Sequence, residues 1–179
     1  MGQILNIAVQ LVLFRGTPAS LPASSQLLLR VIAVYLILST VVVTALYGGP
    51  LSLLSSIMVS GVVYGGLALL LIVNNRQERL TQAMIALLVV DILISLLQFP
   101  VLLVLQPYSG ASAWAWLGFL LWLLGVHSRI VGAALDWNPA LAGVFVLLIT
   151  ATGLYVGLAL LPPPPDTASL APDSVFAFG

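Results

Sequence analysis

Five long apolar stretches, separated by short turns, leave few folds open to this chain. Each stretch has about 20 residues, the length that an α-helix needs to cross the hydrocarbon core of a membrane. The chain is 61% hydrophobic and only 6% charged, whereas a soluble domain has about 25% charged residues. We therefore expect an all-α bundle of transmembrane helices. The predicted spans are about 27–47, 51–73, 80–105, 112–132 and 139–161, and together they make one membrane domain over 26–161.

All basic residues fall on one side of these spans. They are Arg15, Arg30, Arg76, Arg79 and Arg129, and the chain has no lysine. The two turns on the other side and the C-terminal segment contain no basic residue. By the positive-inside rule, this distribution predicts a cytoplasmic N-terminus and, after five spans, a C-terminus on the outer side. We expect a bacterial inner-membrane protein whose C-terminus is periplasmic.

Residues 1–25 precede the first span and predict a short helix and a loop. In residues 3–14, Gln3, Asn6 and Gln10 recur on one helical face of an otherwise apolar stretch. This pattern predicts an amphipathic helix, lying either in the membrane interface or against the bundle. The apolar run comes before Arg15 rather than after it, so it is not typical of a cleaved secretory signal.

Residues 162–179 form a proline-rich tail. They begin with four consecutive prolines, which favour a stiff polyproline II conformation. The tail ends in the apolar sequence VFAFG. Phe176 and Phe178 are therefore either the anchors of a docking peptide or part of a disordered end.

Asp91 is the residue that costs most to place in a membrane. It lies near the middle of the third span, where a carboxylate costs about 3 kcal/mol. Along the fourth span, His127 lies about 8 Å from the centre, at a depth similar to that of Asp91. Arg129 is one step shallower but has a long side chain. We expect Asp91 to pair with His127 or Arg129, either to fix the helix register or to relay protons or ions.

Two further polar residues follow Asp91 in the third span. Ser95 and Gln98 come four and then three residues later, so all three share one helical face. We expect this face to point inward, where it could line a cavity or hydrogen-bond to a neighbouring helix.

Small and aromatic residues supply candidate helix contacts. The small residues recur at the spacing that lets helix backbones approach closely, either within the chain or towards another subunit; they are Ser56, Ser60, Gly61, Gly65, Gly153 and Gly157. Trp114 and Trp116 predict an aromatic belt at the outer interface. Together with Trp122, they are candidate contacts for a partner.

Several classes of function find no support in the sequence. There is no phosphate-binding loop, nucleophile elbow or paired zinc-ligand motif, and there is no cysteine. A single histidine does not build a two-histidine metal site. A net charge of zero gives no reason to expect nucleic acid as a partner. We predict no catalytic residues, no metal, no cofactor and no enzymatic activity.

Three stretches resemble the Ypt-interacting protein (YIP) family, in its bacterial branch. LFRGTPASLPASS is similar to the family's short lead-in and proline-containing loop, and residues 52–66 are similar to its small-residue helix. LLWLLGVHSRIVGAALDWNPALAGVFVLL, residues 120–148, resembles its fourth and fifth spans. The resemblance implies five spans with an exported C-terminus. It brings no catalytic residues, and this chain has almost no cytoplasmic domain with which to bind the small GTPases of eukaryotic members.

Two functions follow as hypotheses. The first is a non-enzymatic scaffold or accessory subunit of a larger membrane assembly, since the short loops leave lateral helix contact as the main means of recognition. Its partners would be membrane lipids and other membrane subunits or further copies of itself. The alternative is a small transporter or proton-coupled channel that uses Asp91 and His127. An Asp91→Asn change separates them, because only the second requires an ionisable group there.

Overall fold

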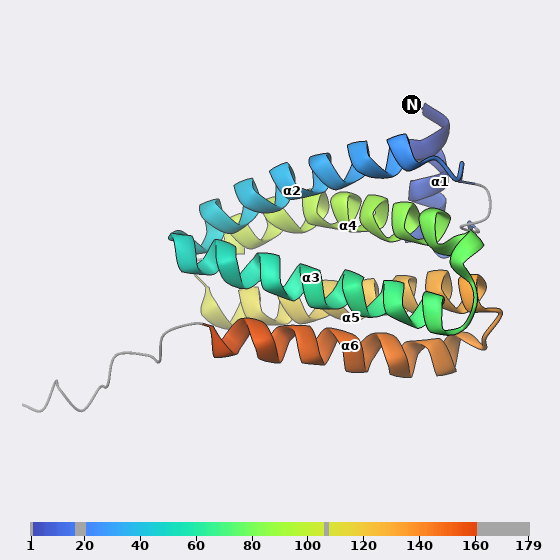
Figure 1. Ribbon diagram of the computed structural model, residues 1–179. Helices are drawn as coiled ribbons and strands as arrows, with labels where there is room; N and C mark the ends of the chain where they lie inside the picture. Colours follow the sequence, from blue (N-terminus) through green and yellow to red (C-terminus); the bar gives the residue numbers. More distant parts are fainter. Residues whose placement is uncertain (1, 17–20, 106–107, 161–179) are drawn as a thin grey trace, which may run out of the picture.

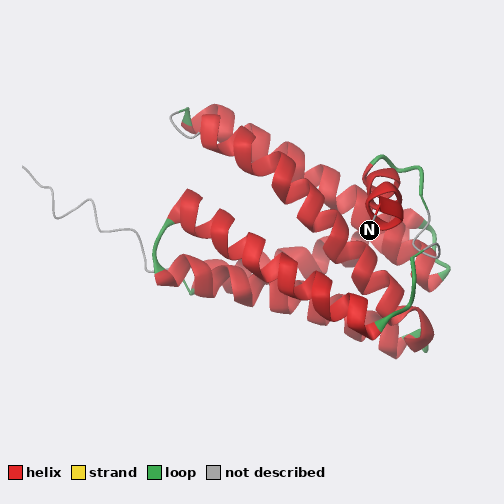
Figure 2. Ribbon diagram, turned by 90° about the horizontal axis from the view of Figure 1, so that it is seen from above, coloured by secondary structure: helices red, strands yellow, loops and turns green. Residues whose placement is uncertain are grey.

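The computed structural model describes residues 2–16, 21–105 and 108–160. Over these residues the chain forms six helices and no strand (Figure 2). They are α1 (Gly2–Val12), α2 (Ser25–Tyr47), α3 (Pro50–Val73), α4 (Gln77–Leu105), α5 (Ser109–Leu135) and α6 (Pro139–Ala159). Helices α2 to α6 are long and apolar enough to cross a membrane. This confirms the predicted all-α fold and makes the chain an integral, multi-pass membrane protein.

The helix ends follow local sequence signals. Ser24 caps α2 by accepting a hydrogen bond from the backbone N–H of Leu27 at 3.4 Å. Asn138 caps α6 in the same way through Ala140, at 2.9 Å. Both α3 and α6 start with proline, whose missing N–H is not needed in a first turn. Residues 48–49 are glycines with φ of 63° and 75°, a conformation that glycine adopts at little cost.

The five long helices run side by side and alternate in direction (Figure 1). Contacts link α2 to α4, α4 to α5, α5 to α6 and α6 to α3, and α3 returns to α2. One end of the bundle, which we call the arginine end, carries α1 and the turns at 74–76 and 136–138. The opposite end, which we call the distal end, carries the turn at 48–49 and the last turn of α6.

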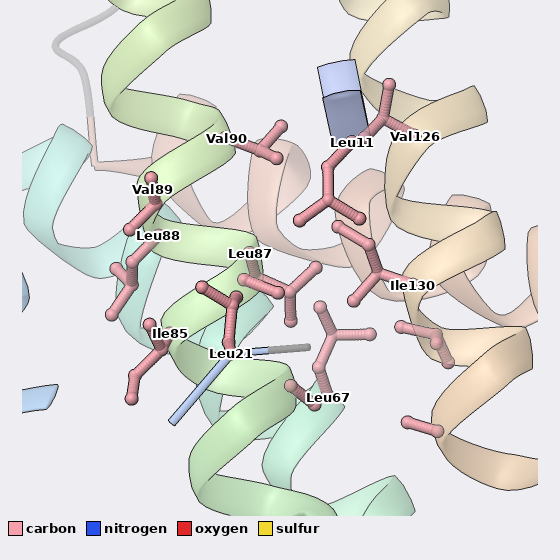
Figure 3. Packing of buried hydrophobic residues seen from close by; sticks show 14 of the residues in the cluster. Leu11, Leu21, Leu67, Ile85, Leu87, Leu88, Val89, Val90, Val126 and Ile130 are labelled. Atoms are coloured by element: carbon pink, nitrogen blue, oxygen red, sulfur yellow. The ribbon is translucent and has the colours of Figure 1, made fainter. Parts of the chain in front are cut away.

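The buried apolar core lies in the arginine half of the bundle, and Figure 3 shows how its side chains pack. It is formed by the last turns of α3, the first half of α4, the last third of α5 and the start of α6. Fully or almost fully buried members include Leu67, Leu71, Ile85, Leu87, Val90, Val126, Ile130, Val131, Ala142 and Val146. Farther towards the distal end than Ile94, the buried residues in the described ranges are Leu102, Gly153 and Gly157.

Helix α1 is docked on the bundle at the arginine end. It packs against α4, and its residues Ala8, Leu11 and Val12 are buried in the core. Asn6 and Gln10 remain exposed, as expected for the polar face of an amphipathic helix. Contact with the bundle is thus one of the two predicted alternatives for this helix. Its position in the membrane interface stays a prediction.

Candidate functional site

Asp91 lies at the midpoint of α4 and is held by side chains from α3 and α5. Its Oδ1 is 2.7 Å from Nε2 of His127, and its Oδ2 accepts a hydrogen bond from the hydroxyl of Tyr64. The His127 side chain is 3% exposed and that of Asp91 is 12% exposed. Both carboxylate oxygens are therefore partnered, as the cost of desolvating a carboxylate requires. The structure brings together two of the three residues that the depth argument selected.

The polar contacts continue from Tyr64 towards α2. The rings of Tyr64 and Tyr35 meet edge to face, with their centroids 5.4 Å apart. The Tyr35 hydroxyl in turn lies 2.9 Å from Oγ of Ser60. We call the group of His127, Asp91, Tyr64, Tyr35 and Ser60 the Asp91 centre. It draws on four helices, α2 to α5.

The spacing of residues on α3 explains why this centre faces inward. Ser56, Ser60 and Tyr64 recur every four residues and so lie on one helical face. The hydroxyl groups of Ser56 and Ser60 point at α2, with Ser56 3.5 Å from Ser39 and Ser60 bonded to Tyr35. The two serines predicted as packing residues thus contact their neighbour through hydroxyl groups.

A cavity of about 160 Å³ lies beside the Asp91 centre. All five members of the centre line it, together with Val59, Val63, Leu120, Leu123, Leu124, Thr150 and Leu154. This volume is sufficient for water, whose share of the liquid is about 30 Å³ per molecule. The ionisable pair is therefore next to open space rather than enclosed on all sides by apolar packing.

A larger cavity of about 470 Å³ adjoins the first on its distal side. Its lining is rich in polar side chains, namely Ser52, Ser55, Ser56, Ser60 and Gln98, with Trp116 as an aromatic wall. Tyr35, Val59, Ser60 and Leu154 line both cavities, so the two spaces meet at these residues. On the other side of Asp91, the packed core of the arginine half fills the space between the helices.

The Asp91–His127 pair has the chemistry of a proton-holding site. Nε2 of His127 faces Asp91, while Nδ1 has no hydrogen-bond partner among the described residues. In the described part of the chain, no fully buried side-chain nitrogen or oxygen lacks a partner. Nδ1 therefore keeps contact with open space. Among the residues that the structure describes, no three histidine, cysteine, aspartate or glutamate side chains converge as a metal-ligand group.

Arg129 does not join Asp91; of the two predicted partners, the structure pairs His127 with the carboxylate. Nη1 of Arg129 donates a hydrogen bond to the carbonyl of Phe14, and its guanidinium carbon lies 5.7 Å from the centroid of the Phe14 ring. The reason is helical geometry: Arg129 follows His127 by two residues, a rotation of about 200°, so the two side chains leave α5 in opposite directions.

The predicted glycine contacts divide into two kinds. A Cβ at Gly153 or Gly157 would meet Val59 of α3, and the hydroxyl of Ser55 donates to the carbonyl of Gly157 at 2.8 Å. These glycines therefore bring α6 close to α3. Gly61 and Gly65 are exposed, and a Cβ at either position would meet nothing within 4 Å. Of the two predicted alternatives, this pair does not pack within the chain, and its contact with another subunit stays a prediction.

The remaining candidate residues have varied surroundings. Ser95 is half-buried on α4, and Gln98 lines the larger cavity with Trp116. Trp114 is 75% exposed. Trp122 is used inside the molecule, because its indole N–H donates to the carbonyl of Val12 at 3.1 Å. Phe176 and Phe178 lie outside the described residues.

Tyr35 and Tyr64 were missed as candidate residues. A signal for them was present in the sequence: each tyrosine lies inside an apolar span rather than at its end, and Tyr64 continues the spacing of Ser56 and Ser60. A hydroxyl at that depth needs a hydrogen-bond partner.

Comparison with known proteins gives no further guide to the site. The chain matches no protein-family model, no curated protein and no solved structure. Its resemblance to the YIP family stays a proposal.

Proposed function

We propose that this chain is a small proton-coupled transporter or channel, and that the Asp91 centre is its working element. The observation that carries the proposal is the position of the Asp91–His127 pair, at mid-helix and beside two adjoining cavities. Ionisable residues at this depth are costly and mark proton or ion pathways. A pair that served only to fix helix register would gain nothing from the neighbouring open space.

The pair can hold one exchangeable proton. It can exist as carboxylate and imidazolium or as carboxylic acid and neutral imidazole, and both forms are neutral overall. The Tyr64 hydroxyl donates to the other carboxylate oxygen and holds the carboxyl group in place. Loss of the proton leaves a single negative charge beside the cavity, which favours re-protonation or the entry of a small cation.

In this arrangement the Asp91 centre is open towards the distal end of the bundle only. The serine-lined cavity extends from Tyr35 and Ser60 into the distal half, whereas the arginine half is closed by the core. We propose that the arginine end faces the cytoplasm of a bacterium, in keeping with the positive-inside rule. The centre then exchanges protons with the periplasmic side.

The test is proton flux into proteoliposomes that contain a pH-sensitive dye. With a potassium diffusion potential imposed, wild-type protein should acidify the lumen faster than protein-free vesicles do. Asp91→Asn keeps the size and one acceptor oxygen but removes the ionisable carboxylate, and it should return the rate to that of empty vesicles. Ser95→Ala, one helical turn away on the same face, is the matched control and should retain flux. Equal rates for wild type, Asp91→Asn and empty vesicles would overturn the proposal.

The scaffold or accessory subunit is the second candidate, and one observation favours it. Gly61 and Gly65 lie on an open face of α3, where they allow another helix to approach closely. Mild solubilisation from the native membrane and measurement of the particle mass tests it. A large particle with other polypeptides, unchanged by Asp91→Asn, would favour the scaffold. A monomer or small homo-oligomer would count against it.

A further inference from the structure

A third pocket lies at the arginine end, apart from the Asp91 centre. It has a volume of about 210 Å³ and lies between the segment that follows α1, the last turns of α5 and the start of α6. Its apolar wall includes Leu11, Val126 and Ile130 (Figure 3), and Phe14 and Trp137 add aromatic rings. Arg129 is the charged residue in this lining.

The charge of Arg129 is not neutralised by a carboxylate in the described part of the chain. Arg76 and Arg79 provide the contrast, because each lies 2.7 Å from a carboxylate oxygen of Asp136. Arg129 has instead the Phe14 carbonyl and ring as neighbours. These contacts leave its Nη2 and Nε groups available as donors.

The position of Arg129 along α5 makes its guanidinium suitable for binding an anion. Six residues separate it from the end of α5, so it lies about 9 Å inside the helix end. Its side chain is exposed, so an anion can reach it from outside the bundle, and beside apolar walls the attraction is stronger than between charges in bulk water. A guanidinium with two free donor groups suits the oxygens of a phosphate.

We infer that this pocket binds the headgroup phosphate of an anionic phospholipid, with the glycerol and upper acyl chains against Leu11, Val126 and Trp137. The apolar and aromatic lining favours a lipid over free phosphate, since basic pockets between transmembrane helices suit lipid headgroups. Tryptophan is typical of the level at which such headgroups lie. This inference does not depend on proton transport at Asp91.

Native mass spectrometry of the full-length protein in detergent tests the inference. Phosphatidylglycerol, which has a net negative charge, and phosphatidylcholine, whose choline cation offsets its phosphate, are titrated separately. Wild type should hold one phosphatidylglycerol about tenfold more tightly, because its headgroup charge is not compensated and attracts the guanidinium more strongly. Arg129→Gln should remove this preference, while Arg129→Lys should restore most of it. Arg30→Gln, which removes an exposed arginine from α2, is the matched control and should keep it.

Two further arms make the result decisive. Ala133→Leu fills the pocket, in whose lining Ala133 lies, but leaves the arginine in place, and it too should abolish the preference. This variant serves if Arg129→Gln does not fold. Inorganic phosphate at equal concentration should not displace the lipid. Equal binding of the two lipids by wild type, equal behaviour of Arg129→Gln and Arg30→Gln, or full displacement by phosphate would overturn the inference.

Discussion

The arginine half and the distal half of this bundle are packed in different ways. In the arginine half, leucine, isoleucine and valine side chains from α1, α3, α4, α5 and α6 are buried against one another. In the distal half, serines and Gln98 border open space. Close contact between helices there occurs mainly where Gly153 and Gly157 of α6 meet α3. Asp91 lies at the boundary. The difference indicates that one half holds the fold together and that the other gives access to an ionisable group.

This arrangement matches a general division between stability and function. Local stability follows buried apolar contact, and the parts of a protein that bind or move are drawn from its less stable regions. The distal half has fewer buried residues among those described. We therefore expect substitutions of equal size to have unequal effects in the two halves.

The largest expected difference concerns two leucines. Leu87 is fully buried in the arginine half, so Leu87→Ala should lower the free energy of unfolding by about 2–5 kcal/mol. Leu154 lines both cavities, and its truncation only enlarges existing space, so Leu154→Ala should cost about 1 kcal/mol or less. Unfolding by sodium dodecyl sulfate in mixed micelles measures both. Equal losses would show that the halves are packed alike.

A smaller effect is expected at two glycines. Gly157→Leu places a side chain against Val59 and Ser55 of α3 and should destabilise the protein by about 1–3 kcal/mol through overpacking. Gly65 lies on the open face of α3, so the leucine of Gly65→Leu meets no neighbouring atom there. This variant should leave stability nearly unchanged. The same unfolding assay compares them. A stable Gly157→Leu variant would mean that α6 and α3 separate without cost, which the present account does not allow.

The sequence predicts the fold well because the membrane constrains it strongly. Length and hydropathy place each long helix end within three residues of its observed position. Depth along neighbouring helices also brings Asp91 and His127 to one level, since a mid-span carboxylate needs a partner at its own depth. Both inferences use only the position of a residue along the membrane normal.

The sequence leaves open the rotation of each helix around its axis, which depth does not determine. Arg129 has a suitable depth but leaves α5 on the side away from Asp91. Gly61 and Gly65 have the contact spacing of Gly153 and Gly157 but face outward. These helices are apolar all round, so their hydrophobic periodicity is weak. The periodicity therefore does not show which side of a helix packs against its neighbour.

The smallest expected effect lies at the surface of the arginine end. The hydrogen bond from Arg79 and the charges of Arg79 and Arg76 hold the pKa of Asp136 below its ordinary value. Its ionised form therefore stabilises the fold above the pKa of the unfolded chain, about 3.9, and this contribution is lost as the pH falls through the lower folded pKa.

Asp136→Asn tests this contact and keeps a residue type that tolerates the left-handed conformation found there, with φ of 57°. Because exposed ion pairs contribute little, the variant should melt only slightly below wild type at pH 7. At pH 3 the two melting temperatures should converge. A gap that is equal at both pH values would show that the carboxylate charge is not the cause.

Access to the Asp91 centre from the distal end alone is the central claim, and the absence of native cysteine allows a direct test. Ser60→Cys places one thiol where the two cavities meet, and Ser128→Cys, half-buried in the arginine half, is the control. A membrane-impermeant cationic thiol reagent is applied to oriented vesicles from each side in turn. The account predicts that Ser60→Cys is modified only from the distal side. Modification only from the arginine side, or from neither side, would contradict it.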